Sequence, residues 1–212
     1  MKKYVAILLA LVCILSGCGG VPAETAPTTT VPATEPAPQP TGTLYVAFGA
    51  VLEMVYDSDG NALSITGVNE DGKNLAAAHQ DQLNKGCVYA LRAILRYAIT
   101  EELLKDAKTV TVRIGADDPL PCEDFLFTIG QDCQYLIDEE VAGIDMYCLT
   151  DDCLDETGNV TSGIAAKLAA TYLGVEETAL TGGETSVDGL YTFSAGENAC
   201  TVDAFTGLVA AA

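Results

Sequence analysis

The segment that follows position 43 alternates apolar and polar residues, which is the spacing of a half-buried β-strand. The apolar positions that share one face are Val46, Phe48, Ala50, Leu52 and Met54. Leu63 and Ile65 repeat this spacing on a returning strand, and the acidic, Gly-containing stretch 57–61 has the composition of a turn. The pattern therefore predicts a hairpin over 45–68. We interpret 57–61 as a turn rather than a calcium loop, because it is shorter than the roughly twelve residues of an EF-hand loop and lacks the closing Glu.

The stretch 69–72, Asn-Glu-Asp-Gly, resembles a strand exit in which Gly72 takes a positive φ. After Gly86 a three- to four-residue repeat replaces the alternation and predicts a long amphipathic helix. Its apolar stripe comprises Val88, Leu91, Leu95, Ile99 and Leu103. Alternation returns over 109–114, where Val110, Val112 and Ile114 alternate with Thr109, Thr111 and Arg113, and predicts a strand.

The next predicted elements follow a break at Pro119 and Pro121. Apolar residues over 122–136 have the spacing of a second helix, although 125–129 also suits a strand, and 144–149 is predicted as another strand. The resulting order, β-β-α-β-α-β, indicates an α+β fold in which the helices cover one face of a sheet.

The last fifty residues contain an Ala-rich segment with Ile164, Leu168 and Tyr172 at helical spacing, which ends at Gly174. Two alternating segments, 190–194 and 199–204, then predict a β-hairpin. We expect this helix-hairpin unit, within 151–212, to form a second folded unit after an α+β domain at 43–150.

The N-terminus carries an export signal, because the basic pair Lys2-Lys3 precedes an apolar run over 4–15 and the sequence Leu-Ser-Gly-Cys at 15–18. This layout resembles the signals of bacterial lipoproteins, which implies cleavage before Cys18 and its acylation by lipid such as palmitate. An uncleaved anchor is the alternative, but 4–15 is shorter than the roughly 20 residues of a spanning helix. Residues 19–42 are rich in Pro, Thr and Ala and predict a semi-extended linker. We therefore expect a protein anchored by lipid to the extracytoplasmic face of the cell membrane.

The chain is strongly acidic, with 30 Asp and Glu against 10 Lys and Arg, for a net charge of −20. Loss of Lys2 and Lys3 with the signal would take the charge to −22. Nucleic acid is excluded as a partner, because phosphate binding needs clustered Lys and Arg. The same charge opposes flat contact with an anionic bilayer, so that the linker would hold the domain off the membrane. An acidic surface that only keeps an exported protein soluble needs no partner at all.

Six cysteines remain after removal of Cys13 and acylation of Cys18, namely Cys87, Cys122, Cys133, Cys148, Cys153 and Cys200. Outside the cell they permit up to three disulfides, in about 15 full pairings. Cys148 and Cys153 are the most plausible pair, because the turn-forming Asp151-Asp152 lies between them. Buried free thiols are the alternative. A zinc site is not expected, because the chain has no Cys-x-x-Cys pair and only one histidine, His79. We expect no metal and no other cofactor.

Residues 43–150 resemble the extracytoplasmic middle domain of RsgI-type anti-sigma factors. The likeness lies in the Leu-Glu-Met run at 52–54, the acidic turn and the stretch 67–73 before a helix. In that family an Asn-Pro bond ahead of the corresponding run is the site of self-cleavage, whereas this chain has Gly49, Ala50 and Val51 there. We therefore predict no self-cleavage, and a second N-terminus near Gly49 in an intact mass spectrum would contradict this. Where that family has a sigma-binding segment and a spanning helix ahead of this domain, we expect only the lipid signal and the linker.

Residues 161–212 resemble a PepSY unit, through the helix-hairpin order and the ending Val-Asp-Ala-Phe-Thr-Gly-Leu-Val at 202–209. The resemblance implies extracytoplasmic binding, or restraint of a protease, and brings no catalytic residues. Both resemblances thus imply non-catalytic modules.

Candidate catalytic groups in the sequence have simpler interpretations. His79 lies in a polar stretch and is predicted to face solvent, and Cys87 and Cys122, which lie near helix starts, are predicted to be packed or paired. Adjacent carboxylates at 117–118, 139–140, 151–152 and 176–177 are typical of loops and helix ends. We therefore expect no catalytic residues.

Three hypotheses about function follow. The first is a non-enzymatic envelope lipoprotein that binds a protein or peptide outside the cell, in envelope sensing or protease restraint. The second is a cell-wall or glycan hydrolase, which needs two carboxyl groups roughly 5 to 9.5 Å apart across a cleft. The third is a structural surface protein without a specific ligand.

Overall fold

The computed structural model describes residues 37–115, 122–141 and 143–212. The predicted signal with Cys18, most of the linker, and the breaks at Pro119 and Pro121 lie outside these residues. The described part is an α+β protein, as the sequence predicted. It contains no helix that is long and apolar enough to cross a membrane.

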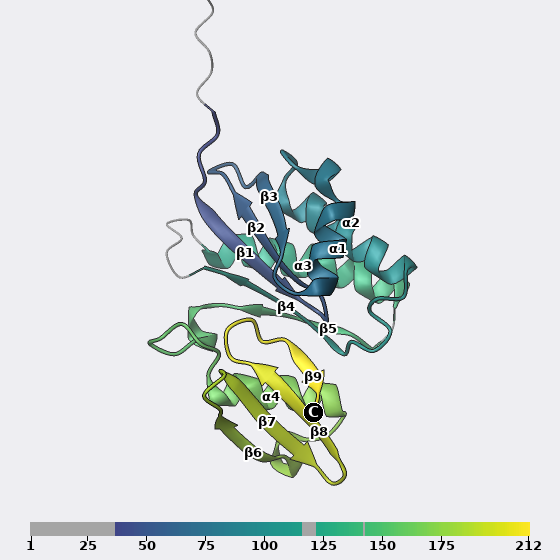
Figure 1. The fold of residues 1–212 in the computed structure, drawn as a ribbon, viewed down its shortest axis with the longest axis vertical. Helices are drawn as coiled ribbons and strands as arrows, with labels where there is room; N and C mark the ends of the chain where they lie inside the picture. Colours follow the sequence, from purple (N-terminus) through teal and green to yellow (C-terminus); the bar gives the residue numbers. More distant parts are fainter. Residues whose placement is uncertain (1–36, 116–121, 142) are drawn as a thin grey trace, which may run out of the picture. The chain divides into compact units, whose positions relative to one another are not determined.

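The described chain forms two β-sheets, shown in Figure 1. The first has the strand order β3-β2-β1-β4-β5, with β4 and β5 parallel and the other pairs antiparallel, and the second is an antiparallel sheet of order β6-β7-β8-β9. The strands are β1 (Gly42–Ala47), β2 (Val51–Tyr56), β3 (Ala62–Gly67), β4 (Thr109–Ile114), β5 (Asp145–Leu149), β6 (Thr181–Thr185), β7 (Leu190–Ala195), β8 (Asn198–Asp203) and β9 (Val209–Ala211). The α-helices are α1 (Glu70–Ala78), α2 (Cys87–Thr100), α3 (Cys122–Glu140) and α4 (Ser162–Leu173), and the short 3₁₀ helices are η1 (Gln80–Gln82), η2 (Asp151–Cys153) and η3 (Glu177–Ala179).

The hairpin predicted over 45–68 is a three-stranded meander instead. A tight turn at 48–50 divides the first predicted strand into β1 and β2, with the Phe48 N–H donating to the Ala50 carbonyl at 3.0 Å. Gly49 adopts φ +105° there, a conformation that other residues rarely take. The second turn lies where the sequence predicted it, because Asp57 Oδ1 accepts hydrogen bonds from the backbone N–H groups of Asp59 and Asn61.

The predicted strand exit at 69–72 is the start of a helix, so the expectation of a positive φ at Gly72 is wrong. Asn69 is the N-cap of α1, and its side chain accepts from the Gly72 N–H at 2.9 Å. A Cβ on Gly72 would come 2.1 Å from the Val51 carbonyl oxygen. Glycine is therefore needed at this position for close approach between α1 and β2, not for its backbone angle.

The helices α2 and α3 form where the sequence predicted them, and α3 continues through Gly130, so that 125–129 is helical rather than a strand. The apolar stripe predicted for α2 ends early, because the helix stops at Thr100 and Leu103 is 48% exposed. Figure 1 shows α1, α2 and α3 on one face of the five-stranded sheet, and buried side chains of the sheet and these helices form the first core cluster.

The other face of β4 is also buried. All six residues of this strand are buried, including the polar Thr109, Thr111 and Arg113. The segment that covers them comes from the end of the chain, since Thr111 Oγ1 donates to the Thr206 carbonyl at 2.8 Å. Gly207 fits against this face because a Cβ there would lie 3.0 Å from Leu149 Cδ1 and 3.2 Å from Thr111 Cγ2.

The second core cluster joins α4 to the four-stranded sheet. Helix α4 ends at Gly174, as predicted, and this residue takes the left-handed conformation with φ +68°. The predicted hairpin is β7-β8, to which the structure adds β6 and β9 as edge strands. Leu149, the last residue of β5, belongs to this second cluster. The domain boundary after residue 150 stays a prediction.

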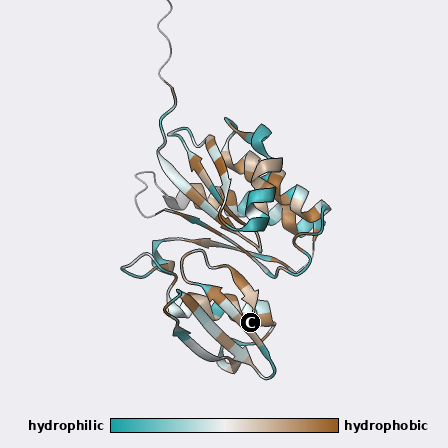
Figure 2. Ribbon diagram, viewed as in Figure 1, coloured by the Kyte–Doolittle hydropathy of each residue, from teal (hydrophilic) through white to brown (hydrophobic). Residues whose placement is uncertain are grey.

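Figure 2 shows hydrophobic and hydrophilic residues interspersed along the strands of both sheets.

Candidate functional site

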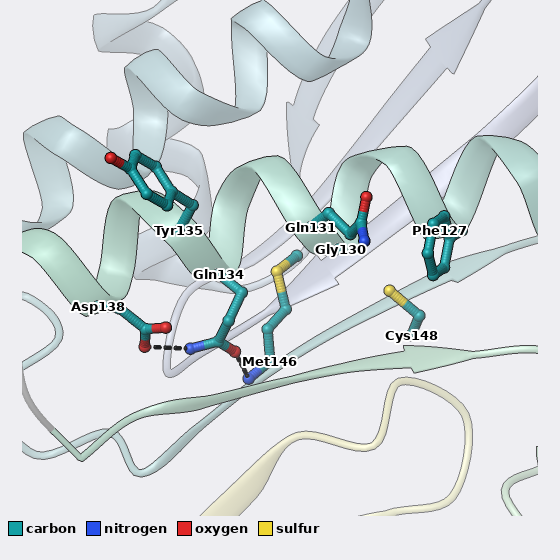
Figure 3. A pocket seen from close by; sticks show the side chains of 8 residues that line it. All are labelled: Phe127, Gly130, Gln131, Gln134, Tyr135, Asp138, Met146 and Cys148. Carbon is teal, nitrogen blue, oxygen red and sulfur yellow. Dashed lines mark hydrogen bonds between the residues drawn. The ribbon is translucent and has the colours of Figure 1, made fainter.

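An open groove of about 490 Å³ runs between helix α3 and strand β5. Its lining residues are Phe127, Gly130, Gln131, Gln134, Tyr135, Asp138, Met146 and Cys148. The six residues from α3 recur at three- and four-residue spacing, so they form one face of that helix. Figure 3 shows Phe127, Gln134 and Asp138 projecting from α3 toward β5, with Met146 and Cys148 projecting back from the strand. The groove is thus built by one helix face and the edge strand of the first sheet.

Two aromatic side chains in this groove are largely exposed, although their size favours burial. Phe127 is 62% exposed and Tyr135 is 61% exposed. The apolar stripe that packs α3 onto the core runs through Ile129, Cys133 and Leu136, which are fully buried. Phe127 and Tyr135 therefore contribute little to the core, and exposed aromatic rings that line a hollow are typical of an interaction surface.

The side chain of Gln134 occupies part of the edge of β5. Its Oε1 accepts from the Met146 N–H at 2.7 Å, and its Nε2 donates to the Ile144 carbonyl at 3.2 Å and to Asp138 Oδ1 at 2.7 Å. The amide thus bonds to β5 as the backbone of a neighbouring strand would. Capping an edge strand in this way reduces unspecific strand pairing, so a ligand here would be held mainly by its side chains.

Gly130 brings helix and strand together in the floor of the groove. A Cβ at this position would lie 2.6 Å from Cys148 Sγ, well inside contact distance. The Cys148 thiol in turn donates to the Leu126 carbonyl at 3.2 Å. Gly130 and Cys148 therefore fix the distance between α3 and β5, and with it the width of the groove.

The cysteine side chains that the structure describes are free thiols, and three of them are buried, namely Cys87, Cys133 and Cys200. Cys148 and Cys153, the predicted disulfide pair, are both free thiols in the structure, and the pairing stays a prediction. Burial raises the pKa of Cys148, and the neighbouring Cys153 raises it further. Burial also raises the pKa of Cys87, the first residue of α2, to about 12, so this thiol is protonated at neutral pH despite its place at a helix N-terminus. The side chain of Cys122 lies outside the described part.

The sequence placed His79 in solvent, and this prediction is wrong. His79 is 6% exposed, and its Nδ1 lies 2.8 Å from the Leu75 carbonyl oxygen. Its ring packs edge-on against Tyr97, with 4.9 Å between the ring centres. The histidine is therefore a packed residue at the end of α1.

The carboxylate pairs that the structure describes are exposed and lie on different elements. Residues 139–140 end α3, 151–152 belong to η2, and 176–177 flank the start of η3. The pair at 117–118 lies outside the described residues. Within the described ranges, no group of three or more His, Cys, Asp or Glu side chains is placed to hold a metal ion.

Sequence reasoning missed this groove, although one signal was present. Phe127 and Tyr135 lie off the apolar stripe of Ile129, Cys133 and Leu136, and large apolar residues on the polar side of an amphipathic helix mark an exposed patch. The contribution of β5 was not visible, because it depends on the parallel pairing of β4 and β5.

No protein-family model matches the chain, and no curated protein matches its sequence. The resemblances to RsgI-type middle domains and to PepSY units therefore stay predictions.

Proposed function

We propose that this protein is a non-enzymatic envelope lipoprotein that binds a segment of a partner protein in the groove between α3 and β5. The observation that carries the proposal is the exposure of Phe127 and Tyr135 beside a groove of about 490 Å³. The lipid signal ending at Cys18 and the Pro-rich linker support an extracytoplasmic place for this groove.

The groove favours an extended peptide with at least one large apolar side chain. Its volume lies in the range of small ligand sites, about 300 to 1,000 Å³, but it is open to solvent, which suits a peptide chain rather than an enclosed small molecule. Phe127, Met146 and the Cys148 side chain offer apolar contacts, and Gln131 offers an amide for the peptide backbone. The apolar side chain would lie against the Phe127 ring, while Gln134 keeps the Met146 N–H satisfied.

The peptide site can be tested with the full-length chain in a non-ionic detergent and a phage-displayed library of short peptides. Because the chain contains no Trp, a single Trp in a selected peptide reports binding by its own fluorescence. We expect selected peptides to share an apolar side chain and Phe127→Ala to weaken their binding about tenfold, as for a buried aromatic contact. Tyr89→Ala, which removes an aromatic that is 74% exposed on α2, is the matched control and should leave binding unchanged. Equal loss in both variants, or none in either, would contradict the proposal.

The anchor is tested separately. Metabolic labelling with palmitate in a bacterial host should label the wild-type chain, and Cys18→Ala should lose both the label and the membrane fraction. A Cys18→Ala protein that still fractionates with membranes would refute the lipid anchor and leave the groove untouched.

A further inference from the structure

A second hollow, of about 470 Å³, lies on the exposed side of helix α2 and is basic. Its lining residues are Gln82, Lys85, Tyr89, Arg92, Ala93 and Arg96. The four residues from α2 recur at positions i, i+3, i+4 and i+7, so their side chains share one face. We call this surface the α2 basic face.

The charge of this face is opposite to that of the rest of the chain. The sequence has 10 Lys and Arg, of which Lys2 and Lys3 belong to the predicted signal, and three of the other eight line this hollow. Lys85 forms an exposed ion pair with Asp81 at 3.9 Å. Arg92 and Arg96 form no ion pair with any residue of the described chain, although the protein has 30 acidic residues. The guanidinium groups of Arg92 and Arg96 thus have no carboxylate partner among the described residues.

We propose that the α2 basic face binds an acidic segment of a partner protein. Guanidinium groups bind carboxylates through paired N–H donors. Arg92 and Arg96 are four residues apart, which is about 6 Å along a helix axis, and carboxylates on alternate residues of an extended strand are about 6.8 Å apart. Tyr89 adds an exposed ring and hydroxyl, and Gln82 adds an amide at the edge.

The same charges argue against a long polyanion. A polymer of phosphates would extend beyond the α2 basic face onto the surface of a chain with net charge −20, where it is repelled. A short acidic segment can place its charges beside Arg92 and Arg96, and beside Lys85, which also pairs with Asp81. Attraction at this range acts within the Debye length, about 8 Å at physiological salt, so local charge outweighs the net charge of the protein.

The test uses the full-length chain in non-ionic detergent and a hexaglutamate peptide with one terminal Trp, again because the protein has none. We expect the double variant R92Q/R96Q to weaken binding about fivefold or more, the combined effect expected for two charge contacts at the protein surface. The variant K105Q/K108Q removes the same net charge elsewhere and should leave binding unchanged. Arg96→Gln alone, at an exposed position, gives a smaller loss in the same direction and guards against a folding defect in the double variant.

Three results would overturn the proposal. Equal weakening in R92Q/R96Q and K105Q/K108Q would show a general charge effect. Tighter binding of inorganic polyphosphate than of the peptide, lost in R92Q/R96Q, would assign the face to a phosphate polymer. Self-association of the wild-type chain that R92Q/R96Q abolishes, without peptide binding, would assign it to contact between copies. Phe127→Ala should leave hexaglutamate binding unchanged, so the proposals for the α2 basic face and for the α3–β5 groove are tested independently of each other.

Discussion

The guanidinium carbon of Arg113 lies 4.3 Å from the centre of the Phe205 ring, although 92 residues separate them in the sequence. Arg113 Nη1 also donates hydrogen bonds to the carbonyl oxygens of Phe205 and Gly158, the latter at 2.9 Å. The arginine is 1% exposed, and its Nε has no hydrogen-bond partner within the described part of the chain. Burial lowers the pKa of Arg113, and Tyr45 and Asp203 partly oppose this. One buried cation thus fastens the C-terminal segment to the first sheet.

Arg113→Ala should destabilise the protein by about 2 to 4 kcal/mol, because it leaves two carbonyl groups without their charged donor and opens a cavity over Phe205. Arg113→Lys should recover only part of this loss, since a lysine cannot reproduce the planar fork over the ring. Urea unfolding followed by circular dichroism measures both. Lys167→Ala, which removes a cation 5.6 Å from the Tyr147 ring centre, is the control and should cost about 1 kcal/mol or less. An Arg113→Ala protein as stable as wild type would show that this contact does not hold the segment.

Asn69 joins three segments through one side chain. Its Oδ1 accepts from the N–H groups of Gly72 and Val51, both at 2.9 Å, and its Nδ2 donates to the Gly49 carbonyl at 2.7 Å. Asn69→Ala should therefore cost about 2 to 3 kcal/mol, more than the roughly 1 kcal/mol typical of an N-cap alone.

Thr161→Ala, which removes an N-cap with one longer bond, 3.4 Å to the Ile164 N–H, provides the comparison. Thermal unfolding of both variants distinguishes the stability that the N-cap hydrogen bond contributes from the stability that the two bonds to the β1–β2 turn contribute. Equal losses in Asn69→Ala and Thr161→Ala would mean that these two bonds add nothing to stability.

The sequence predicted the fold class and most helices and strands, and the division of the first strand shows why it missed a turn. Ala47 pairs with Val51, so three residues form the turn between them. Because an odd number of residues intervenes, even-numbered positions lie on the same face in β1 and in β2. Val46 and Leu52 are directly opposite each other, and the alternation continues through the turn without a visible break.

The burial of β4 shows a second reason why the sequence pattern does not predict the whole fold. Thr111 and Arg113 have the polar character of a solvated face, but the groups that satisfy them are backbone carbonyls of residues 158, 205 and 206. Any residue type supplies such a carbonyl, so no side-chain pattern predicts the contact. The same reason applies to the candidate groove, since Phe127 is visible in the helix pattern whereas its place beside Cys148 follows from strand order.

Asp57 should make the stability of the turn between β2 and β3 depend on pH. Hydrogen bonds from Asn61, and then from the Asp59 backbone, lower the pKa of this carboxyl group below its ordinary value near 3.8. A lowered pKa in the folded state stabilises the protein fully above the unfolded-state pKa, and this contribution is lost as the pH falls through the folded-state value. Asp57→Asn should therefore lower the melting temperature at pH 7, with the difference from wild type shrinking below about pH 3.5.

Asp155 offers an independent repeat of the same measurement. Its pKa is lowered by hydrogen bonds from Thr157 and Asn159, and Asp155→Asn should show the same closing gap. If the difference in melting temperature from wild type stays constant between pH 7 and pH 2.5 in both variants, the charge of these carboxylates does not stabilise the turns.

The thiols should differ in reactivity according to burial. Burial raises the pKa of Cys133 to about 12 and that of Cys200 to about 11, whereas Cys153, the last residue of η2, is half-buried. Because the thiolate is the reactive form, iodoacetamide at pH 8 should label Cys153 before Cys133 and Cys200 in the reduced, folded protein, with Cys133 labelled about a hundredfold more slowly than Cys153. Peptide mass mapping follows each site, and urea should equalise the rates. Rapid labelling of Cys133 without urea would mean that the core around α3 opens far more readily than its packing implies.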